Sequence, residues 1–100
     1  MSANVDGRTA AMNLDQIIEM LIDILARDLE VAVPREQIHP ETTMAQDLGL
    51  DSVALLGLVA AIEERLDFEL RDAVLLPSTF LTVRSVAEGI AASIAASNTA

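Results

Sequence analysis

The first clear pattern in the chain is a run of apolar residues at helical spacing between about positions 14 and 30. The run consists of Leu14, Ile17, Ile18, Leu21, Ile22, Leu25 and Leu29. This spacing places the apolar side chains on one face of an α-helix. Asn13 precedes the run and Gln16 follows three residues later, which is the pattern of a capping box at a helix N-terminus. We therefore predict a helix over about residues 14–30, preceded by a flexible tail at 1–12.

Between this helix and the next lies a stretch from about 31 to 50 that has no helical period. Its turn formers and helix breakers are Pro34, Pro40, Thr42, Thr43 and Gly49. So long a connection is unusual in a small domain, and loops of this length are often functional. We expect Ile38 and Met44 to anchor the loop to the core, and His39, which precedes a proline, to be a solvated loop residue.

A second helical pattern begins at Asp51, and it has two separate apolar arcs at about 100° per residue. The first arc consists of Leu55, Leu58, Val59, Ile62 and Leu66, and the second of Val53, Leu56 and Ala60. Ser52 lies at the border between the arcs, in the first turn. A helix in a small bundle needs only one apolar stripe, so we assign the first arc to the core and the second to partner docking. The alternative is that the second arc is extra core, covered by the long loop or by the next helix.

The rest of the chain predicts one short helix, over about residues 71–81, and one longer helix that Thr82 can cap. The apolar residues of the last helix are Val83, Val86, Ala87, Ile90, Ala91 and Ile94. We place the end of the domain at 96 and treat 97–100 as a frayed end. The predicted fold is all-α: a four-helix bundle over 13–96 with three longer helices, one short helix and a long loop between the first two helices.

The composition excludes several classes of function. The chain has 100 residues, with 16 acidic and 6 basic side chains, and its net charge is −10. Because a nucleic-acid binder needs a basic surface and an anionic membrane attracts basic segments, we expect neither as a partner. A basic protein partner, attracted over long range, is favoured instead.

The chain also lacks the residues of a catalytic or metal-binding set. It has no cysteine, and His39 is its single histidine, so a thiolate metal site and a cysteine nucleophile are both excluded. No segment is long and apolar enough to span a bilayer, and the N-terminus lacks the pattern of a signal peptide. We expect a cytoplasmic protein that is not an enzyme and holds no metal.

The candidate site is the start of the second predicted helix, where Gly49-Leu50-Asp51-Ser52-Val53 leads from a tight turn into the first helical turn. A helix N-terminus presents unpaired backbone N–H groups and a partial positive charge, and it therefore stabilises a phosphate group. A phosphodiester on the Ser52 hydroxyl would lie at this end of the helix, with Val53 and Leu56 beside whatever the phosphate carried. The alternative is that Asp51 and Ser52 form only a helix cap.

Together these features resemble the acyl carrier protein family over roughly residues 13–96. The attachment motif of that family is a glycine, any residue, an aspartate, a serine and an aliphatic residue, which stands here as Gly49 to Val53. The resemblance implies that a separate phosphopantetheinyl transferase attaches 4′-phosphopantetheine from coenzyme A to the hydroxyl of Ser52. It also implies that Asp51 helps to bind the transferase and its metal ion. The thiol of the arm would hold acyl groups as thioesters, so the cofactor supplies the chemistry and the protein the positioning.

The predicted recognition surface departs from that of fatty-acid carriers. Those carriers usually have acids two and five positions after the modified serine, where this chain has Ala54 and Gly57. Exposed ion pairs are individually weak, so we expect apolar docking to matter more than charge. The residues that we expect to contact partners are Val53, Leu56, Ala60, Glu63, Glu64 and Asp47. Besides the transferase, the resemblance implies an acyltransferase or ligase that loads the arm, and a ketosynthase or other acyl-processing enzymes that use it.

Several alternatives remain open from the sequence. We favour a monomeric, free-standing carrier of polyketide-type secondary metabolism, such as antibiotic biosynthesis, over a carrier of fatty-acid synthesis or an excised domain. In a different class, an unmodified helical adaptor would bind a partner through Val53 and Leu56. Finally, Leu75, Leu76 and Phe80 could line an inner cavity for short acyl chains with Leu58 and Ile62, although such residues are more often simple core.

Overall fold

The structure of the protein, a computed structural model, describes residues 13–67, 69–70 and 76–99, with side chains through residue 95. Its longer helices are α2 (Leu14–Asp23), α3 (Ser52–Leu66) and α4 (Val83–Thr99). The shorter elements are the π-helix η1 (Ile24–Asp28) and the 3-10 helices η2 (Arg35–Gln37) and η4 (Pro77–Phe80). The all-α prediction is therefore confirmed. The predicted tail at 1–12 lies outside the described residues.

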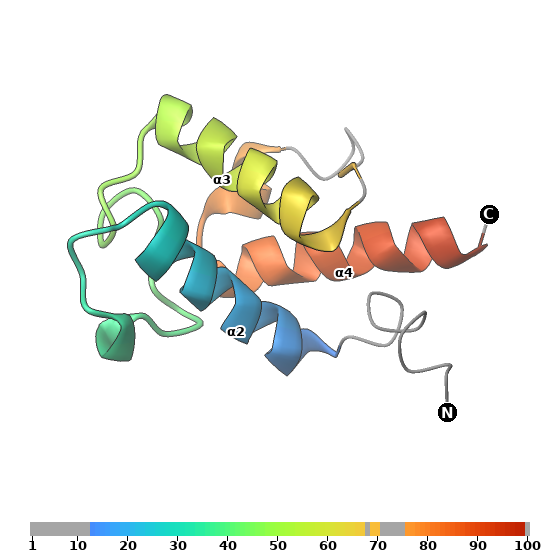
Figure 1. Cartoon of the computed structure of the whole chain (residues 1–100), viewed down its shortest axis with the longest axis horizontal. Helices are drawn as coiled ribbons and strands as arrows, with labels where there is room; N and C mark the ends of the chain where they lie inside the picture. Colours follow the sequence, from blue (N-terminus) through green and yellow to red (C-terminus); the bar gives the residue numbers. More distant parts are fainter. Residues whose placement is uncertain (1–12, 68, 71–75, 100) are drawn as a thin grey trace.

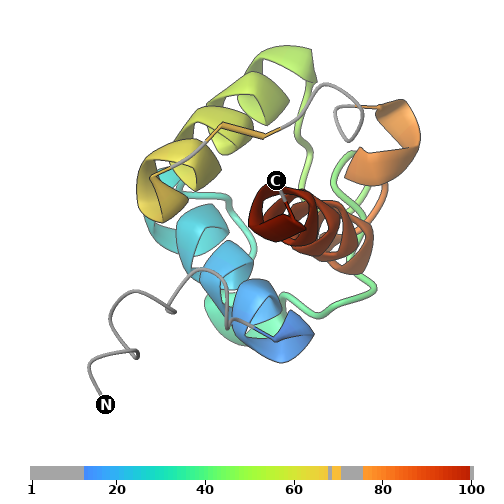
Figure 2. The same cartoon turned by 90° about the vertical axis from the view of Figure 1, so that its right-hand side faces the viewer.

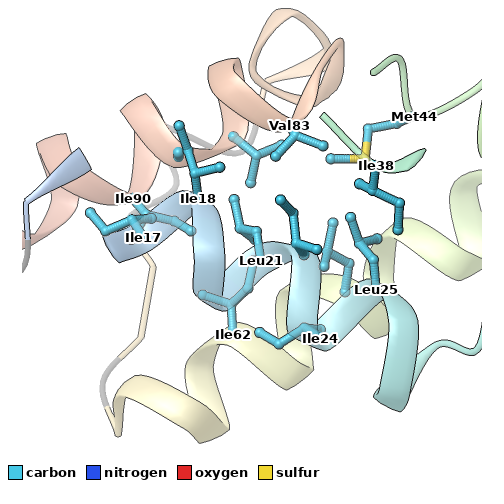
Figure 3. Packing of buried hydrophobic residues seen from close by; sticks show 14 of the residues in the cluster. Ile17, Ile18, Leu21, Ile24, Leu25, Ile38, Met44, Ile62, Val83 and Ile90 are labelled. Atoms are coloured by element: carbon cyan, nitrogen blue, oxygen red, sulfur yellow. The ribbon is translucent and has the colours of Figure 1, made fainter. Parts of the chain in front are cut away.

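The helices enclose one core. Helices α2 and α4 lie side by side and run in opposite directions, while α3 packs on η1 and η4 packs on α4 (Figures 1 and 2). Side chains from α2, η1, α3, α4 and the long loop point toward one another in the interior (Figure 3). Among the described residues, no helix is long and apolar enough to cross a membrane.

The first helix begins as predicted and ends differently. The Gln16 N–H donates to Asn13 Oδ1 (2.8 Å) and the Asn13 N–H to Gln16 Oε1 (2.9 Å), which confirms the capping box. After Asp23 the chain continues as the π-helix η1, in which the Leu29 N–H donates to Ile24 O (3.0 Å). The helical segment therefore ends at Asp28, two residues before the predicted limit.

An ion-pair cluster joins the end of this segment to α3 and to the long loop. The carboxylate of Asp23 lies 3.2 Å from Arg27 Nε, 2.8 Å from Arg35 Nη1 and 3.1 Å from Arg65 Nη2. Arg65 Nη2 also lies 3.7 Å from Asp28 Oδ2. Asp23 and Asp28 are five residues apart, which is the hydrogen-bond spacing of a π-turn. The π-helix thus brings both carboxylates within reach of one arginine of α3.

The long loop is held against the start of α4. Ile38 and Met44 are buried, as predicted, and His39 is exposed. The Met44 N–H donates to Leu81 O (3.0 Å), and the Val83 N–H to Thr42 O (3.1 Å). These bonds flank an isolated antiparallel bridge between Thr43 and Thr82, which the sequence did not predict.

The last two predicted elements are only partly described. Of the short helix expected over 71–81, residues 71–75 lie outside the described residues, and the part that follows is η4 at Pro77–Phe80. Helix α4 begins at Val83, directly after the predicted cap, where the Ser85 N–H donates to Thr82 Oγ1 (3.1 Å). It continues to Thr99, beyond the predicted domain limit at 96.

Candidate functional site

Ser52 is the first residue of α3, and its side chain is exposed. The preceding residue, Asp51, has an extended backbone and caps the helix, because its Oδ1 accepts a hydrogen bond from the Ala54 N–H (2.8 Å). The cap holds the Asp51 carboxylate at the helix end and leaves the Ser52 hydroxyl open to an approaching enzyme. A buried hydroxyl here would have excluded a covalent tether.

The turn before Ser52 has a backbone geometry that favours glycine. Gly49 has φ +68°, in the left-handed region that other residues adopt at a cost. Its N–H donates to Ala45 O (3.0 Å), and the Leu50 N–H donates to Met44 O (3.0 Å). A Cβ atom added at Gly49 would meet no heavy atom within 4 Å. The requirement for glycine is therefore conformational and not steric.

An apolar pocket of about 550 Å³ opens beside Ser52. It is lined by Ala45, Ser52, Leu55, Leu56, Val59, Leu76, Pro77, Phe80 and Leu81. Ser52 is the one polar residue in this lining, and it stands at the end of α3 where the pocket meets the loop. The walls come from α3 on one side and from the loop and η4 on the other.

This pocket differs from the inner cavity that the sequence suggested. Leu58 and Ile62 do not line it, because both are fully buried in the core. Leu76 and Phe80 do line it, and Leu75 lies outside the described residues. The pocket next to the serine therefore lies between α3 and η4, and it shares only Leu76 and Phe80 with the suggested set.

The two arcs of α3 separate as predicted. Leu58, Ile62 and Leu66 of the first arc are buried, while Leu55 and Val59 are half-buried and line the pocket. In the second arc Val53 is 76% exposed and Leu56 70% exposed, and Ala60 is exposed as well. The alternative that this arc is extra core is therefore wrong.

The acidic residues expected at the docking surface have unequal environments. Glu64 is exposed. Asp47 is also exposed, but its Oδ2 accepts a hydrogen bond from the Thr43 N–H (2.9 Å). Glu63 is half-buried, and its Oε2 accepts a hydrogen bond from the Leu70 N–H (2.9 Å). Two of the three carboxylates thus already bind backbone groups within the chain.

The sequence analysis named Leu76 as a possible cavity residue, but it missed Leu81 and the exposure of both leucines opposite α3. Leu76 is 50% exposed and Leu81 61% exposed, and both line the pocket. They extend the apolar surface of Val53 and Leu56 across to η4. In the sequence, Pro77 and Thr82 indicate where elements begin, next to these leucines. The hydrophobic periodicity of a sequence does not show which side chains of so short an element face solvent.

Comparison with known proteins identifies the family. Residues 19–90 match the family model described as a phosphopantetheine attachment site. The chain belongs to the acyl carrier protein family. The acyl carrier protein of Streptomyces coelicolor is 38% identical over 81 residues, which are 81% of this chain and 85% of that protein. Those of Syntrophobacter fumaroxidans and Saccharopolyspora erythraea are 42% and 40% identical over 52 and 53 residues, covering 62% and 54% of those proteins.

Membership decides the class of function. An acyl carrier protein is a carrier and not an enzyme, and its cofactor is phosphopantetheine. The residues at the start of α3 fit that group, because an exposed hydroxyl, a helix N-terminus and an apolar pocket meet there. Within the described ranges, no three histidine or acidic side chains gather to hold a metal ion.

Proposed function

We propose that Ser52 is the attachment residue, and that this carrier holds acyl groups as thioesters on a 4′-phosphopantetheine arm at that position. The single observation that carries the proposal is the exposed Ser52 hydroxyl at the N-terminus of α3, within the sequence Gly49-Leu50-Asp51-Ser52-Val53. The partial positive charge of the helix N-terminus favours the phosphodiester formed there.

The base that activates the Ser52 hydroxyl is proposed to come from the transferase. A serine hydroxyl is a weak nucleophile unless a neighbouring base takes its proton. The nearest acidic side chain in sequence, Asp51, is bound to the Ala54 N–H, which orients its carboxylate along the helix cap. Asp51 is better suited to meeting the transferase and its metal ion at this end of α3, as the family resemblance implies.

The proposed docking surface consists of Val53, Leu56 and Ala60, with Glu64 at its lower end. All four residues are exposed. The charge of the surrounding surface supports a basic partner, because every arginine in the described ranges is in an ion pair, Arg84 with Glu41 (2.6 Å) and the others with Asp23. Unpaired surface charge on those ranges is therefore mainly negative and steers a basic protein toward the carrier.

The pathway that we propose is polyketide-type biosynthesis. The middle of α3 has no acid at Ala54 or Gly57, so contact with a synthase depends on the apolar arc rather than on charge. The relatives are named only as acyl carrier proteins, and a role in fatty-acid synthesis is the second candidate. Offering the loaded carrier to a ketosynthase of each type, and comparing kcat/KM, separates the two. Faster processing by the fatty-acid enzyme would overturn the polyketide assignment.

The attachment itself is tested by intact mass. The protein is incubated with coenzyme A and a broad-specificity phosphopantetheinyl transferase and then weighed. The wild type is expected to gain one phosphopantetheine group, and Ser52→Ala none. A protein that gains nothing with several transferases would instead support an unmodified adaptor that binds through Val53 and Leu56. A gain that survives Ser52→Ala would move the attachment to another residue.

A further inference from the structure

The segment that leads into Ser52 is hydrogen-bonded to the turn at residues 43–47. Three successive backbone N–H groups ahead of the serine donate to carbonyls of that turn. Leu48 donates to Thr43 O (3.2 Å), Gly49 to Ala45 O (3.0 Å) and Leu50 to Met44 O (3.0 Å). Any movement of the turn therefore moves the segment that leads into α3.

A reciprocal pair of hydrogen bonds closes the same turn. The Thr43 N–H donates to Asp47 Oδ2 (2.9 Å), and the Asp47 N–H donates to Thr43 Oγ1 (3.0 Å). The pair has the same pattern as a capping box, in which two side chains accept hydrogen bonds from two backbone N–H groups that would otherwise be unpaired. Both side chains therefore hydrogen-bond within the turn. We call the turn closed when both of these bonds are formed.

The closed turn also contacts the core on one side and the pocket on the other. Met44 is fully buried, and its N–H binds Leu81 O, so the turn is anchored to the start of α4. Figure 3 shows Met44 pointing into the core beside Ile38. On the outer side, Ala45 lines the pocket together with Ser52. The turn therefore connects the core to the wall that faces the serine.

We infer that Thr43 and Asp47 are positioning residues, which present Ser52 to the phosphopantetheinyl transferase by holding this turn closed. The inference rests on Ser52 being the attachment residue. In this role Asp47 acts through a hydrogen bond, and its negative charge is not required. Asparagine keeps the carbonyl acceptor and is an equally good capping residue, so the bond and the charge can be separated by one substitution.

The expected kinetic effect is on KM. When only a fraction of the carrier has the competent turn, its apparent affinity for the transferase falls by that fraction. A turn that is closed one-fifth of the time raises KM about fivefold and leaves kcat unchanged, because the bound carrier is in the closed state. Asp47→Ala and the isosteric Thr43→Val are each expected to behave in this way, and the double variant is expected to be no worse than either.

The test compares these variants with their conservative partners in the coenzyme A transfer assay. Asp47→Asn and Thr43→Ser are expected to keep KM within about twofold of wild type. Amide hydrogen exchange at Gly49 and Leu50 should quicken in Asp47→Ala and Thr43→Val and recover in the conservative variants. Ile90→Val, which trims a buried methyl group in α4, is the control for general loss of stability and should leave KM unchanged.

Two results would overturn the inference. If Asp47→Asn raises KM as much as Asp47→Ala while Thr43→Val does not, Asp47 meets the transferase directly through its charge. If neither Asp47→Ala nor Thr43→Val changes KM, the turn plays no part in presenting the serine. The wild-type protein in the same assay tests the proposed function independently of the turn. If the wild type is not modified, Ser52 is not the attachment residue.

Discussion

The exposure of Leu56 allows docking to be separated from folding by one substitution, Leu56→Glu. Burying a leucine completely stabilises a protein by about 1.5–3 kcal/mol, and Leu56 is 70% exposed. Its replacement should therefore cost only about 0.5–1 kcal/mol of folding free energy, and glutamate is a good helix former. Leu58, on the same helix, is fully buried, so Leu58→Ala should cost about 2–5 kcal/mol.

The assay combines urea unfolding, followed by far-ultraviolet circular dichroism, with kcat/KM for the transferase. Leu56→Glu should lower kcat/KM at least about tenfold, equivalent to about 1.4 kcal/mol, because a charge is then placed in an apolar contact. Ala92→Glu, at an exposed site on α4, adds the same charge away from α3 and should leave kcat/KM unchanged. If Leu56→Glu unfolds the protein, Leu56 contributes far more to stability than its 70% exposure indicates, and the substitution does not separate docking from folding. If it folds and reacts normally, docking occurs elsewhere.

Three further substitutions test the energetics of the fold. Gly57→Ala should raise stability by about 0.8–1 kcal/mol, because a Cβ there meets no heavy atom within 4 Å, and a fall in Tm would contradict this. Ser93→Ala should raise stability by about 1 kcal/mol, because Ser93 is fully buried and its Oγ has no partner among the described residues; a lower urea midpoint would reveal a missing partner. Asp23→Asn should destabilise the protein at pH 7. Hydrogen bonds from Arg35 and then Arg65 hold the pKa of the Asp23 carboxyl below its usual value, so its contribution exists above about pH 4 and is lost as the pH falls through the lowered pKa. The difference between the urea midpoints of the two proteins should therefore shrink as the pH is lowered below about 4, and a difference that does not change with pH would show that the charge is not responsible.

The features that the sequence predicted well depend on neighbouring residues. The capping box of Asn13 and Gln16 and the two arcs of α3 follow from spacings of three and four positions, which any helix imposes. The π-helix at Ile24–Asp28 does not follow from such spacings, because the contacts that stabilise it are made with distant parts of the chain. Ile24 is fully buried there, and Asp28 reaches Arg65 of α3, a residue that no local pattern connects to it.

The site itself was predictable only in part, for the same reason. The place of Ser52 at the start of α3 and the exposed arc could be predicted from a short sequence motif and a helical wheel. The pocket could not, because most of the wall that faces α3 comes from Leu76–Leu81, a segment about 20 to 30 positions further along the chain. The internal hydrogen bonds of Asp47 and Glu63 were also hidden. A carboxylate in a sequence shows its charge but not the backbone N–H that it will bind.

The distribution of exposed aliphatic residues links stability to function. A chain of this size buries only about 60–65% of its unfolded surface, so each large side chain left outside is a substantial loss. Among the described residues, the large exposed hydrophobic side chains are Val53, Leu56, Leu76 and Leu81, and burying the 50–76% of each that is exposed would be worth about 1–2 kcal/mol apiece. Their sum is comparable with the 5–15 kcal/mol net stability typical of a domain. Three of them line the pocket beside Ser52, and the fourth is the residue after the serine. Apolar surface left exposed by chance would be scattered over the molecule. Its concentration around one hydroxyl, on walls braced by the loop and α4, is what a carrier needs if the attached group and its partner enzyme are to meet at a preformed surface.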